Sequence, residues 1–167
     1  MNMYKILISG GTGLIGKDLQ EKLLQKNHEV VILSRKPKKK NEYRWNISDN
    51  YIDENAFKGI THIIHLAGAG IADKRWTTKR KKELIDSRVK SANLLFKKVK
   101  DLKIDLKGFI AASGVGFYGA VTSDKIYTEK DLPHNDFISK VCVDWENASN
   151  QFNQLNIPVT ILRTGIV

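Results

Sequence analysis

Ile-Leu-Ile-Ser-Gly-Gly-Thr-Gly-Leu-Ile-Gly, residues 6–16, is a short apolar run that leads directly into glycines at positions 10, 13 and 16. Such a junction is typical of a site for the pyrophosphate of a dinucleotide. Gly10 permits the tight exit from the strand, Gly13 lets backbone N–H groups approach the phosphates, and Gly16 lets the following helix pack closely. That helix presents the positive end of its dipole to the anion.

The context of the glycines favours nucleotide binding over the alternative, a glycine-rich turn that holds no ligand. An amphipathic helix with Leu19, Leu23 and Leu24 follows them, and a second apolar run covers residues 30–33. This completes a βαβ unit of the expected length. We predict that the cofactor contacts in this unit are Gly10, Gly11, Thr12, Gly13, Leu14, Ile15 and Gly16.

Apolar runs alternate with helical patterns along the whole chain. The alternation predicts a doubly wound, mostly parallel sheet of about six strands with helices on both faces, the α/β class of the NAD(P)-binding Rossmann fold. A chain of 167 residues, 41% of them hydrophobic, is long enough for one such domain, residues 1–167. Strands are expected at 4–9, 29–34, 61–67, 108–113 and 159–163, with an edge strand at 42–47, and helices at 16–26, 53–57, 78–102 and 136–155.

Composition excludes several classes of protein. No run of about 18 apolar residues and no secretion signal is present, so we expect a soluble cytoplasmic protein with no membrane partner. Cys142 is the only cysteine, which excludes an intrachain disulfide and a cysteine-cluster metal site, and we expect no metal. The net charge of +10 permits a nucleic-acid partner, but the basic residues are not interleaved with aromatic ones, and an anionic cofactor or substrate explains them more simply.

The residues after the second strand bear on the choice of cofactor. A site for NAD usually has an acidic residue there, which accepts hydrogen bonds from the ribose 2′-hydroxyl. This chain has Ser34, Arg35 and Lys36 instead, and the two cations are suited to a 2′-phosphate. We therefore predict NADP(H) rather than NAD(H). The alternative is that Arg35 stacks on the adenine or points into solvent.

Two other strand ends carry candidate site residues. Leu66, Ala67 and Gly68 follow one strand, where small residues let the backbone approach the cofactor, although close packing without a ligand would also explain them. Ser113 ends the next strand, and in an open parallel sheet its hydroxyl points toward the ligand crevice and is suited to orient a substrate oxygen. Ser113 is the candidate catalytic residue. His65, inside an apolar strand, is interpreted as a core histidine.

Several motifs resemble a known family. The chain resembles the extended short-chain dehydrogenase/reductase superfamily, which includes the nucleotide-sugar epimerases. The resemblance is carried by the segment from Gly10 to Gly16, called the glycine turn below, by Ala67-Gly68, by the stretch from Ser113 to Gly119 and by Leu162-Arg163-Thr164. Longer strings are similar to its bacterial "epimerase family" branch, whose members often carry the label cell-division inhibitor. These strings are Leu66 to Asp73, Arg75-Trp76, Ser87-Arg88-Val89, Val141-Cys142, Trp145-Glu146 and Arg163 to Val167.

The chain departs from the superfamily where catalysis is expected. The resemblance implies a tyrosine, followed four residues later by a lysine, at the start of the last helix, where the lysine lowers the pKa of the tyrosine. That helix opens Asp136-Phe-Ile-Ser-Lys140 and has no tyrosine; Phe137 has no ionisable group and stands three residues before Lys140. Tyr118 and Tyr127 lie elsewhere. The cofactor half of the site is intact, but ordinary hydride transfer or epimerisation is not expected.

Two arginines are candidates for substrate binding. Arg75 lies in the loop after the strand that carries Ala67, and Arg88 takes the place of an asparagine that the superfamily commonly keeps. We predict that they bind a small anionic substrate such as a nucleotide sugar; the alternative is a solvated loop and a surface arginine.

The resemblance also implies a C-terminal substrate-binding portion that this chain lacks. We therefore expect an NADP(H)-binding domain of a nucleoside-diphosphate-sugar epimerase/dehydratase-like oxidoreductase, inactive by itself because its crevice is open to water. The alternatives are a nucleotide-sensing regulatory module and a cell-division-related interaction protein. The oligomeric state stays open.

Overall fold

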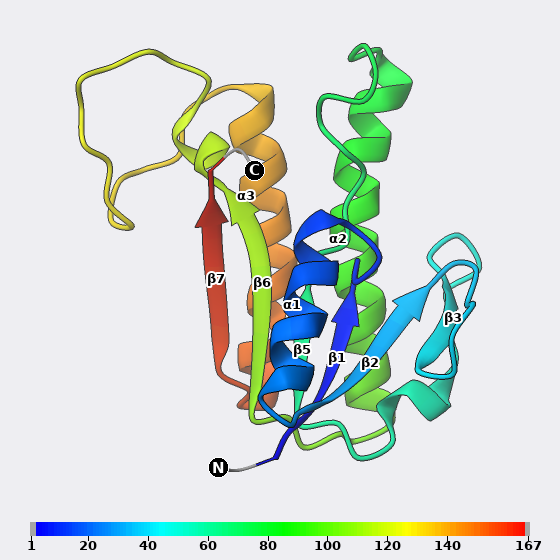
Figure 1. Cartoon of the computed structure of the whole chain (residues 1–167). Coiled ribbons are helices and arrows are strands. Elements are labelled where there is room, and N and C mark those ends of the chain that lie inside the picture. The colour runs from blue at the N-terminus through cyan, green and yellow to red at the C-terminus, as the bar shows by residue number, and fades with distance from the viewer. Residues whose placement is uncertain (1–2, 166–167) are drawn as a thin grey trace.

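The computed structural model describes residues 3–165 and contains one seven-stranded sheet in the order β4-β3-β2-β1-β5-β6-β7 (Figure 1). Met1, Asn2, Ile166 and Val167 of the predicted domain and closing motif lie outside the described residues. The strands are β1 (Lys5–Ser9), β2 (Glu29–Ser34), β3 (Glu42–Asn46), β4 (Tyr51–Ile52), β5 (His62–His65), β6 (Gly108–Gly114) and β7 (Val159–Thr164). The α-helices are α1 (Leu14–Gln25), α2 (Thr78–Asp101) and α3 (Phe137–Asn150), and the 3₁₀ helices are η1 (Glu54–Phe57), η2 (Val115–Tyr118) and η3 (Gln151–Leu155).

The sheet reverses its direction of growth at β1. Successive strands extend it from β1 through β2 and β3 to β4, and the chain then returns to pair β5 with the other side of β1. Every pairing is parallel except that of β3 with β4. The predicted doubly wound α/β fold is therefore confirmed, and its switch point lies between the carboxyl ends of β1 and β5, where such sheets bind ligands.

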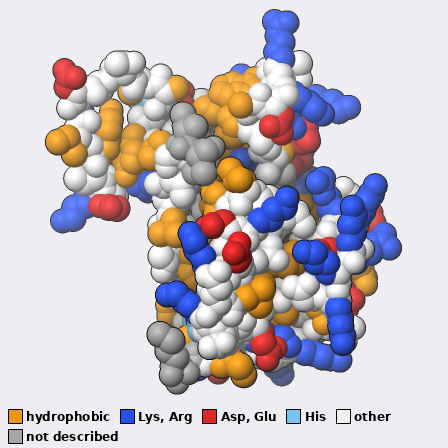
Figure 2. Space-filling view, in the orientation of Figure 1, with side chains coloured by type: hydrophobic (Ala, Val, Ile, Leu, Met, Phe, Trp, Pro, Cys, Tyr) orange, Lys and Arg blue, Asp and Glu red, His pale blue; other side chains and the backbone are white. Residues whose placement is uncertain are grey.

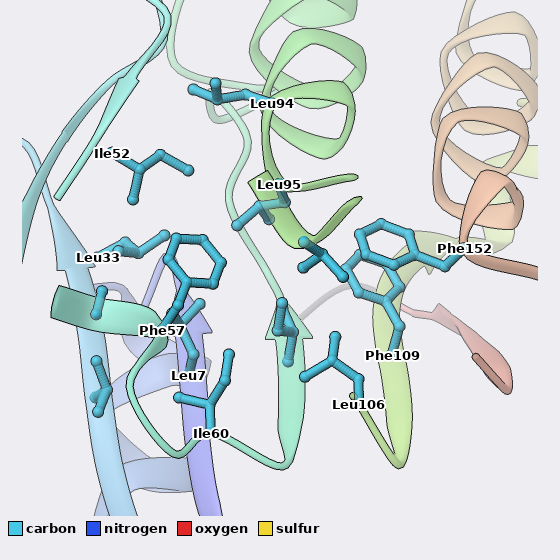
Figure 3. Close-up of a cluster of buried hydrophobic side chains, with 14 of the residues drawn as sticks. Leu7, Leu33, Ile52, Phe57, Ile60, Leu94, Leu95, Leu106, Phe109 and Phe152 are labelled. Carbon is cyan, nitrogen blue, oxygen red and sulfur yellow. The ribbon is translucent and has the colours of Figure 1, made fainter. Parts of the chain in front are cut away.

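The two faces of the sheet carry cores of different size. On β1, Ile6 and Ile8 belong to a small cluster that packs against Leu19 and Leu23 of α1. Leu7 faces the other way, as alternation along a strand requires, and belongs to a larger cluster that includes residues of α2 and η3 (Figure 3). Figure 1 shows α1 on one face and α2 with α3 on the other. The face under α1 is thus the more lightly covered.

The chain begins its three helices in two different ways. Thr77 caps α2 by accepting a hydrogen bond from the N–H of Arg80, and Asp136 caps α3 by accepting one from the N–H of Ser139. The cap position of α1 is Gly13, which has no side chain to accept a bond, and the first turn of α1 contains no acidic residue. The start of α1 therefore keeps free N–H groups for a ligand.

The structure corrects several boundaries. Helix α1 begins two residues earlier than predicted, because Gly13 is its cap, and the predicted helix at 136–155 ends as α-helix at Asn150 and continues as η3. The two-residue strand β4 is additional, since a run so short has no periodicity. The stretch after Ser113 leaves the sheet at Gly114 and turns into η2. The short helix at 53–57 is confirmed as η1.

Candidate functional site

A cavity of about 660 Å³ opens at the carboxyl ends of β1, β5 and β6. Its walls come from the glycine turn, from the segment joining β6 to η2, and from one face of α3. In Figure 2, hydrophobic side chains gather in this region, between the projecting loop at the upper left and the start of α2. The lining residues are Gly10, Gly13, Leu14, Ile15, Gly16, Leu66, Ile71, Trp76, Arg88, Ala112, Ser113, Gly114, Val115, Gly116, Gly119, Ile138, Val141, Cys142, Trp145, Thr164 and Gly165.

Two glycines of the turn are required by packing. Gly10 has a φ of 78°, and a Cβ there would lie 2.8 Å from the backbone N of Ala67. A Cβ on Gly16 would lie 2.5 Å from the carbonyl oxygen of Gly10. The absence of these side chains lets the ends of β1 and β5 touch and lets α1 start against the end of β1.

Gly13 differs from its neighbours in the turn. Its φ of −77° is accessible to any residue, and a Cβ there would meet only the carbonyl oxygen of Gly10, at 3.3 Å. Packing within the protein therefore explains this glycine only weakly. Because Gly13 lines the cavity at the uncapped start of α1, its missing side chain leaves room for a group bound from the cavity side.

The remaining residues of the two predicted backbone segments have varied environments. Gly11 is buried, and a Cβ there would lie 2.6 Å from Cδ1 of Ile32, whereas Thr12 is exposed. Leu66 lines the cavity and Ala67 is buried beneath it. A Cβ on Gly68 would lie 2.9 Å from Cζ of Arg88, a contact that the sequence did not indicate.

The end of β2 carries unpaired positive charge. Arg35 and Lys36 are exposed, and neither forms an ion pair with any residue among 3–165. Ser34 is half-buried, and its Oγ accepts a hydrogen bond from the N–H of Lys36 at 3.2 Å. Figure 2 shows Lys and Arg side chains spread over the side of the molecule where Figure 1 places β2 and β3. Arg35 and Lys36 do not line the cavity itself; they lie outside it, just after the end of β2, the strand next to β1.

Ser113 is held by a buried charged network. Its hydroxyl donates to Oε1 of Glu146 at 2.6 Å, and Arg163 donates to both oxygens of that carboxylate at 2.9 Å. Arg163 also donates to the hydroxyl of Tyr118 at 2.7 Å, and its guanidinium lies over the ring of Phe117. Glu146 raises the pKa of Arg163. Ser113 lines the cavity as predicted, but its proton is engaged on the side of α3.

The start of α3 does not supply a tyrosine–lysine pair. Asp136, four residues before Lys140, is committed to capping the helix and also accepts a hydrogen bond from the N–H of Ala120. Lys140 is exposed, does not line the cavity, and pairs with Asp144 at 3.0 Å. The missing tyrosine is thus not replaced by another acid–base residue at this position.

Another face of α3 lines the cavity instead, through Ile138, Cys142 and Trp145. The sequence argument did not assign these residues to the site. Their i, i+4, i+7 spacing indicates a shared helix face, but not whether that face meets the core or a cavity. Burial raises the pKa of the Cys142 thiol.

The two arginines predicted to bind substrate lie in different environments in the structure. Arg88 is buried, lines the cavity and lies over the ring of Trp145. Arg75 is exposed in the loop before α2 and does not line the cavity. The buried arginine of that region is Arg80, which donates to the carbonyl oxygen of Gly70 and pairs with Glu83 at 2.8 Å. Arg80 thereby ties the loop to α2.

His65 is a core residue, as interpreted from the sequence. It is fully buried, with Oγ of Ser9 2.6 Å from Nδ1 and Oγ of Ser91 3.2 Å from Nε2. Burial lowers its pKa to about 4, so it is neutral at pH 7. The histidine joins the ends of β1 and β5 directly beneath the glycine turn.

Neither a metal-binding cluster nor a membrane-spanning helix is present among residues 3–165. In that range no group of three or more His, Cys, Asp or Glu side chains is placed to hold a metal ion. None of the helices described there combines the length and the apolar character needed to span a bilayer.

Comparison with known proteins gives consistent matches. Residues 6–167 match the model of the NAD dependent epimerase/dehydratase family. An epimerase family protein of Mycobacterium bovis is 34% identical over 163 residues, which are 97% of this chain and 53% of that protein. The chain spans about half the length of the curated relatives it matches.

Two solved structures are similar over nearly the whole chain. The nucleoside-diphosphate sugar epimerase of Corynebacterium glutamicum has a TM-score of 0.84 and 30% identity, over 99% of this chain and 34% of that one. The human epimerase family protein SDR39U1, solved with NADPH, has a TM-score of 0.77 and 26% identity, over 95% of this chain and 52% of that one.

Proposed function

Because the chain belongs to the NAD dependent epimerase/dehydratase family, we propose that it is the NADP(H)-binding domain of an epimerase-like oxidoreductase that acts on a nucleotide sugar or a related anionic compound. The nicotinamide would supply hydride chemistry when bound. The residues of this chain would hold the cofactor and shape one wall of the substrate crevice. The single buried cysteine is consistent with a reducing, cytoplasmic setting.

The observation that carries this proposal is the start of α1. An uncapped helix with no acidic residue in its first turn presents unpaired N–H groups and a partial positive charge. These groups border the cavity beside Gly13, a glycine that packing within the protein does not demand. A pyrophosphate bound there would accept hydrogen bonds from the N–H groups and would use the space that a Cβ would fill.

The preference for NADP(H) rests on the end of β2. Arg35 and Lys36 are exposed, form no ion pair within the described range 3–165, and offer positive charge to a 2′-phosphate. Positions 34–36 contain no acidic residue that would accept hydrogen bonds from a ribose 2′-hydroxyl. The human relative solved with NADPH supports the same assignment.

A second candidate function is a nucleotide-sensing module without catalysis, either regulatory or related to cell division. One observation favours it. Asp136 and Lys140, which occupy the spacing of the expected tyrosine and lysine, are taken up by helix capping and by a surface ion pair. In that case cofactor occupancy would alter the contacts of the protein with a partner rather than turn over a substrate.

Titration with NADPH and NADH tests the proposed function. Trp76 and Trp145 both line the cavity, so energy transfer from tryptophan to the reduced nicotinamide reports binding. We expect NADPH to bind more tightly than NADH, and Arg35→Asp to weaken NADPH at least about tenfold while leaving NADH nearly unchanged.

The matched control is Lys97→Asp, the same change of charge at an exposed site on α2 whose one ion-pair partner within residues 3–165 is Asp101. It should leave both affinities unchanged. No binding of either nucleotide would refute the cofactor assignment. Equal weakening of both by Arg35→Asp would refute the NADP(H) preference alone.

A further inference from the structure

The loop that joins β5 to α2 forms part of the cavity wall. It covers residues 66–77, contains no helix or strand, and contributes Leu66, Ile71 and Trp76 to the lining. The side chain of Trp76 is 40% exposed although it lines the cavity, so its ring lies at the boundary between the cavity and solvent. In Figure 1, α2 and α3 both start at the upper end of the molecule, which this loop reaches.

Polar contacts hold this loop to itself and to α2. Arg80 of α2 donates to the carbonyl oxygen of Gly70 and lies 3.7 Å from Oδ2 of Asp73. Within the loop, Nε1 of Trp76 donates to the carbonyl oxygen of Ile71 at 2.8 Å. The indole ring is therefore fixed to its own loop, and the loop is fixed to α2.

The contact between this loop and α3 is of a different kind. The ring of Trp76 meets the ring of Phe137, the first residue of α3, edge to face with the centroids 5.5 Å apart. Nζ of Lys81 on α2 lies 5.0 Å from the centre of the same phenyl ring. Within residues 3–165, no hydrogen bond or ion pair joins the loop to α3. Separating the loop from α3 therefore breaks ring contacts and no hydrogen bond.

Phe137 is not itself part of the cavity wall. It is half-buried and does not line the cavity, whereas Trp76 and the next residue of α3, Ile138, do line it. Loss of the phenyl ring would therefore release Trp76 and leave the residues of the lining unchanged. Cys142, one helical turn beyond Ile138, lines the same cavity and is 5% exposed.

We propose that the contact between Trp76 and Phe137 is a gate that closes the cavity mouth and limits the rate at which a ligand enters and leaves. In the closed state the two rings bridge the starts of α2 and α3. In the open state Trp76 moves away from α3 while Arg80 keeps the loop attached to α2. The inference rests on the proposed function, because NADPH is the ligand whose exchange is measured. Since the gate closes on the empty and on the occupied cavity, its loss changes both rates and not their ratio.

Stopped-flow fluorescence measures the association and dissociation of NADPH. In Phe137→Ala we expect both rate constants to rise about three- to tenfold, the change that corresponds to the loss of one aromatic contact, while Kd changes less than about twofold. Phe137→Tyr keeps the ring and should keep the wild-type rates. Tyr127→Ala is the matched control, because it removes a ring that stacks on Tyr118 in the segment between η2 and α3. It should leave both rate constants unchanged.

A second measurement needs no cofactor. A thiol reagent reaches Cys142 only when the cavity is open to it, so the rate of modification reports on the gate in the empty protein. We expect Phe137→Ala to raise this rate about three- to tenfold and Tyr127→Ala to leave it unchanged. Modification through the gate is nearly independent of urea at low concentration, whereas modification through global unfolding rises steeply with urea. The urea dependence thus separates the gate from a loss of stability.

Two results would overturn the gate. One is that Phe137→Ala leaves both the NADPH rate constants and the reactivity of Cys142 at their wild-type values. The other is a faster dissociation alone, with Kd raised in proportion, which would assign Phe137 to the cofactor site. If wild type bound no NADPH and Phe137→Ala still made Cys142 more reactive, the cofactor assignment would fail and the gate would stand. If Phe137→Ala does not fold, Phe137→Leu decides the question, with smaller changes expected in the same direction.

Discussion

The hydroxyl of Ser113 donates its proton to Glu146 across 2.6 Å, from the end of β6 to the middle of α3. With the proton engaged, the oxygen retains only its lone pairs for a ligand in the cavity. Ser113 is therefore suited to accept a hydrogen bond from a substrate hydroxyl or amide, and not to donate one to a carbonyl oxygen. The hydrogen bond to Glu146 therefore limits how Ser113 could orient a substrate: its oxygen can accept a hydrogen bond but has no free proton to donate.

The network around Glu146 should contribute strongly to stability. Arg163→Met leaves a carboxylate whose side chain is 10% exposed without its cation, so we expect the free energy of unfolding to fall by about 3–5 kcal/mol. Urea unfolding followed by circular dichroism measures the change. Lys140→Met, which breaks the exposed pair with Asp144, should cost less than about 1 kcal/mol. Similar losses for both variants would contradict the buried role of Arg163.

The glycines of the turn should separate stability from binding. Gly16→Ala brings a Cβ within 2.5 Å of backbone and should lower the free energy of unfolding by about 1–3 kcal/mol. Gly13→Ala meets one atom at 3.3 Å and should cost about 0.5 kcal/mol or less, yet weaken NADPH at least about tenfold. Urea unfolding and the fluorescence titration together measure this. An unaltered NADPH affinity in Gly13→Ala would mean that the cofactor does not approach this glycine.

The buried His65 should make the protein sensitive to mild acid. Its pKa is lowered to about 4 in the folded state, against about 6.5 when unfolded, so between these values the unfolded chain binds more protons. The contribution to stability is full above pH 6.5 and is lost as pH falls toward 4, by about 3 kcal/mol in total. His65→Gln lacks this titration, so its stability should change less than that of wild type between pH 6.5 and 5. Parallel pH profiles for the two proteins would show that His65 does not titrate as described.

The single thiol offers a probe of the cavity wall. Cys142 is 5% exposed, and burial raises its pKa, so both access and the thiolate fraction are reduced. At pH 7.5 we expect a thiol reagent to react with the folded protein at least about a hundredfold more slowly than with the protein in urea. Comparable rates in the two states would place the thiol in solvent.

The sequence predicted the fold well because its signals are local. The strands β1, β2 and β6 each carry a continuous apolar run, and the glycines of the turn mark the first strand-to-helix junction. The environment of Gly68 shows the limit, since the sequence indicated backbone approach to a ligand and the structure places the Arg88 guanidinium there. That contact joins residues 20 positions apart, one in the loop after β5 and one on α2, and no periodicity in the sequence indicates it.

The sequence did not predict the wall that α3 contributes to the cavity. The spacing of Ile138, Cys142 and Trp145 predicts a helix but not a site, because an apolar face toward a cavity has the same spacing as one toward a core. The partner of Ser113 could not be found either. Glu146 lies 33 residues away on another element, and only the packing of α3 on β6 brings them together. Arg75 and Arg88 were equivalent as charges, and burial alone distinguishes them.

The small core between α1 and the sheet should make local opening of this helix easy. Gly16 is the only residue of α1 that is buried, and the cluster beneath it has four buried members, so local opening of this helix should require less free energy than opening of α2. A ligand held at its first turn binds only the closed state and would add its binding free energy to that opening. Amide hydrogen exchange in α1 should therefore slow when NADPH binds, while exchange in the middle of α2 changes little. The nucleotide would therefore control how often α1, the helix that binds its phosphates, opens locally.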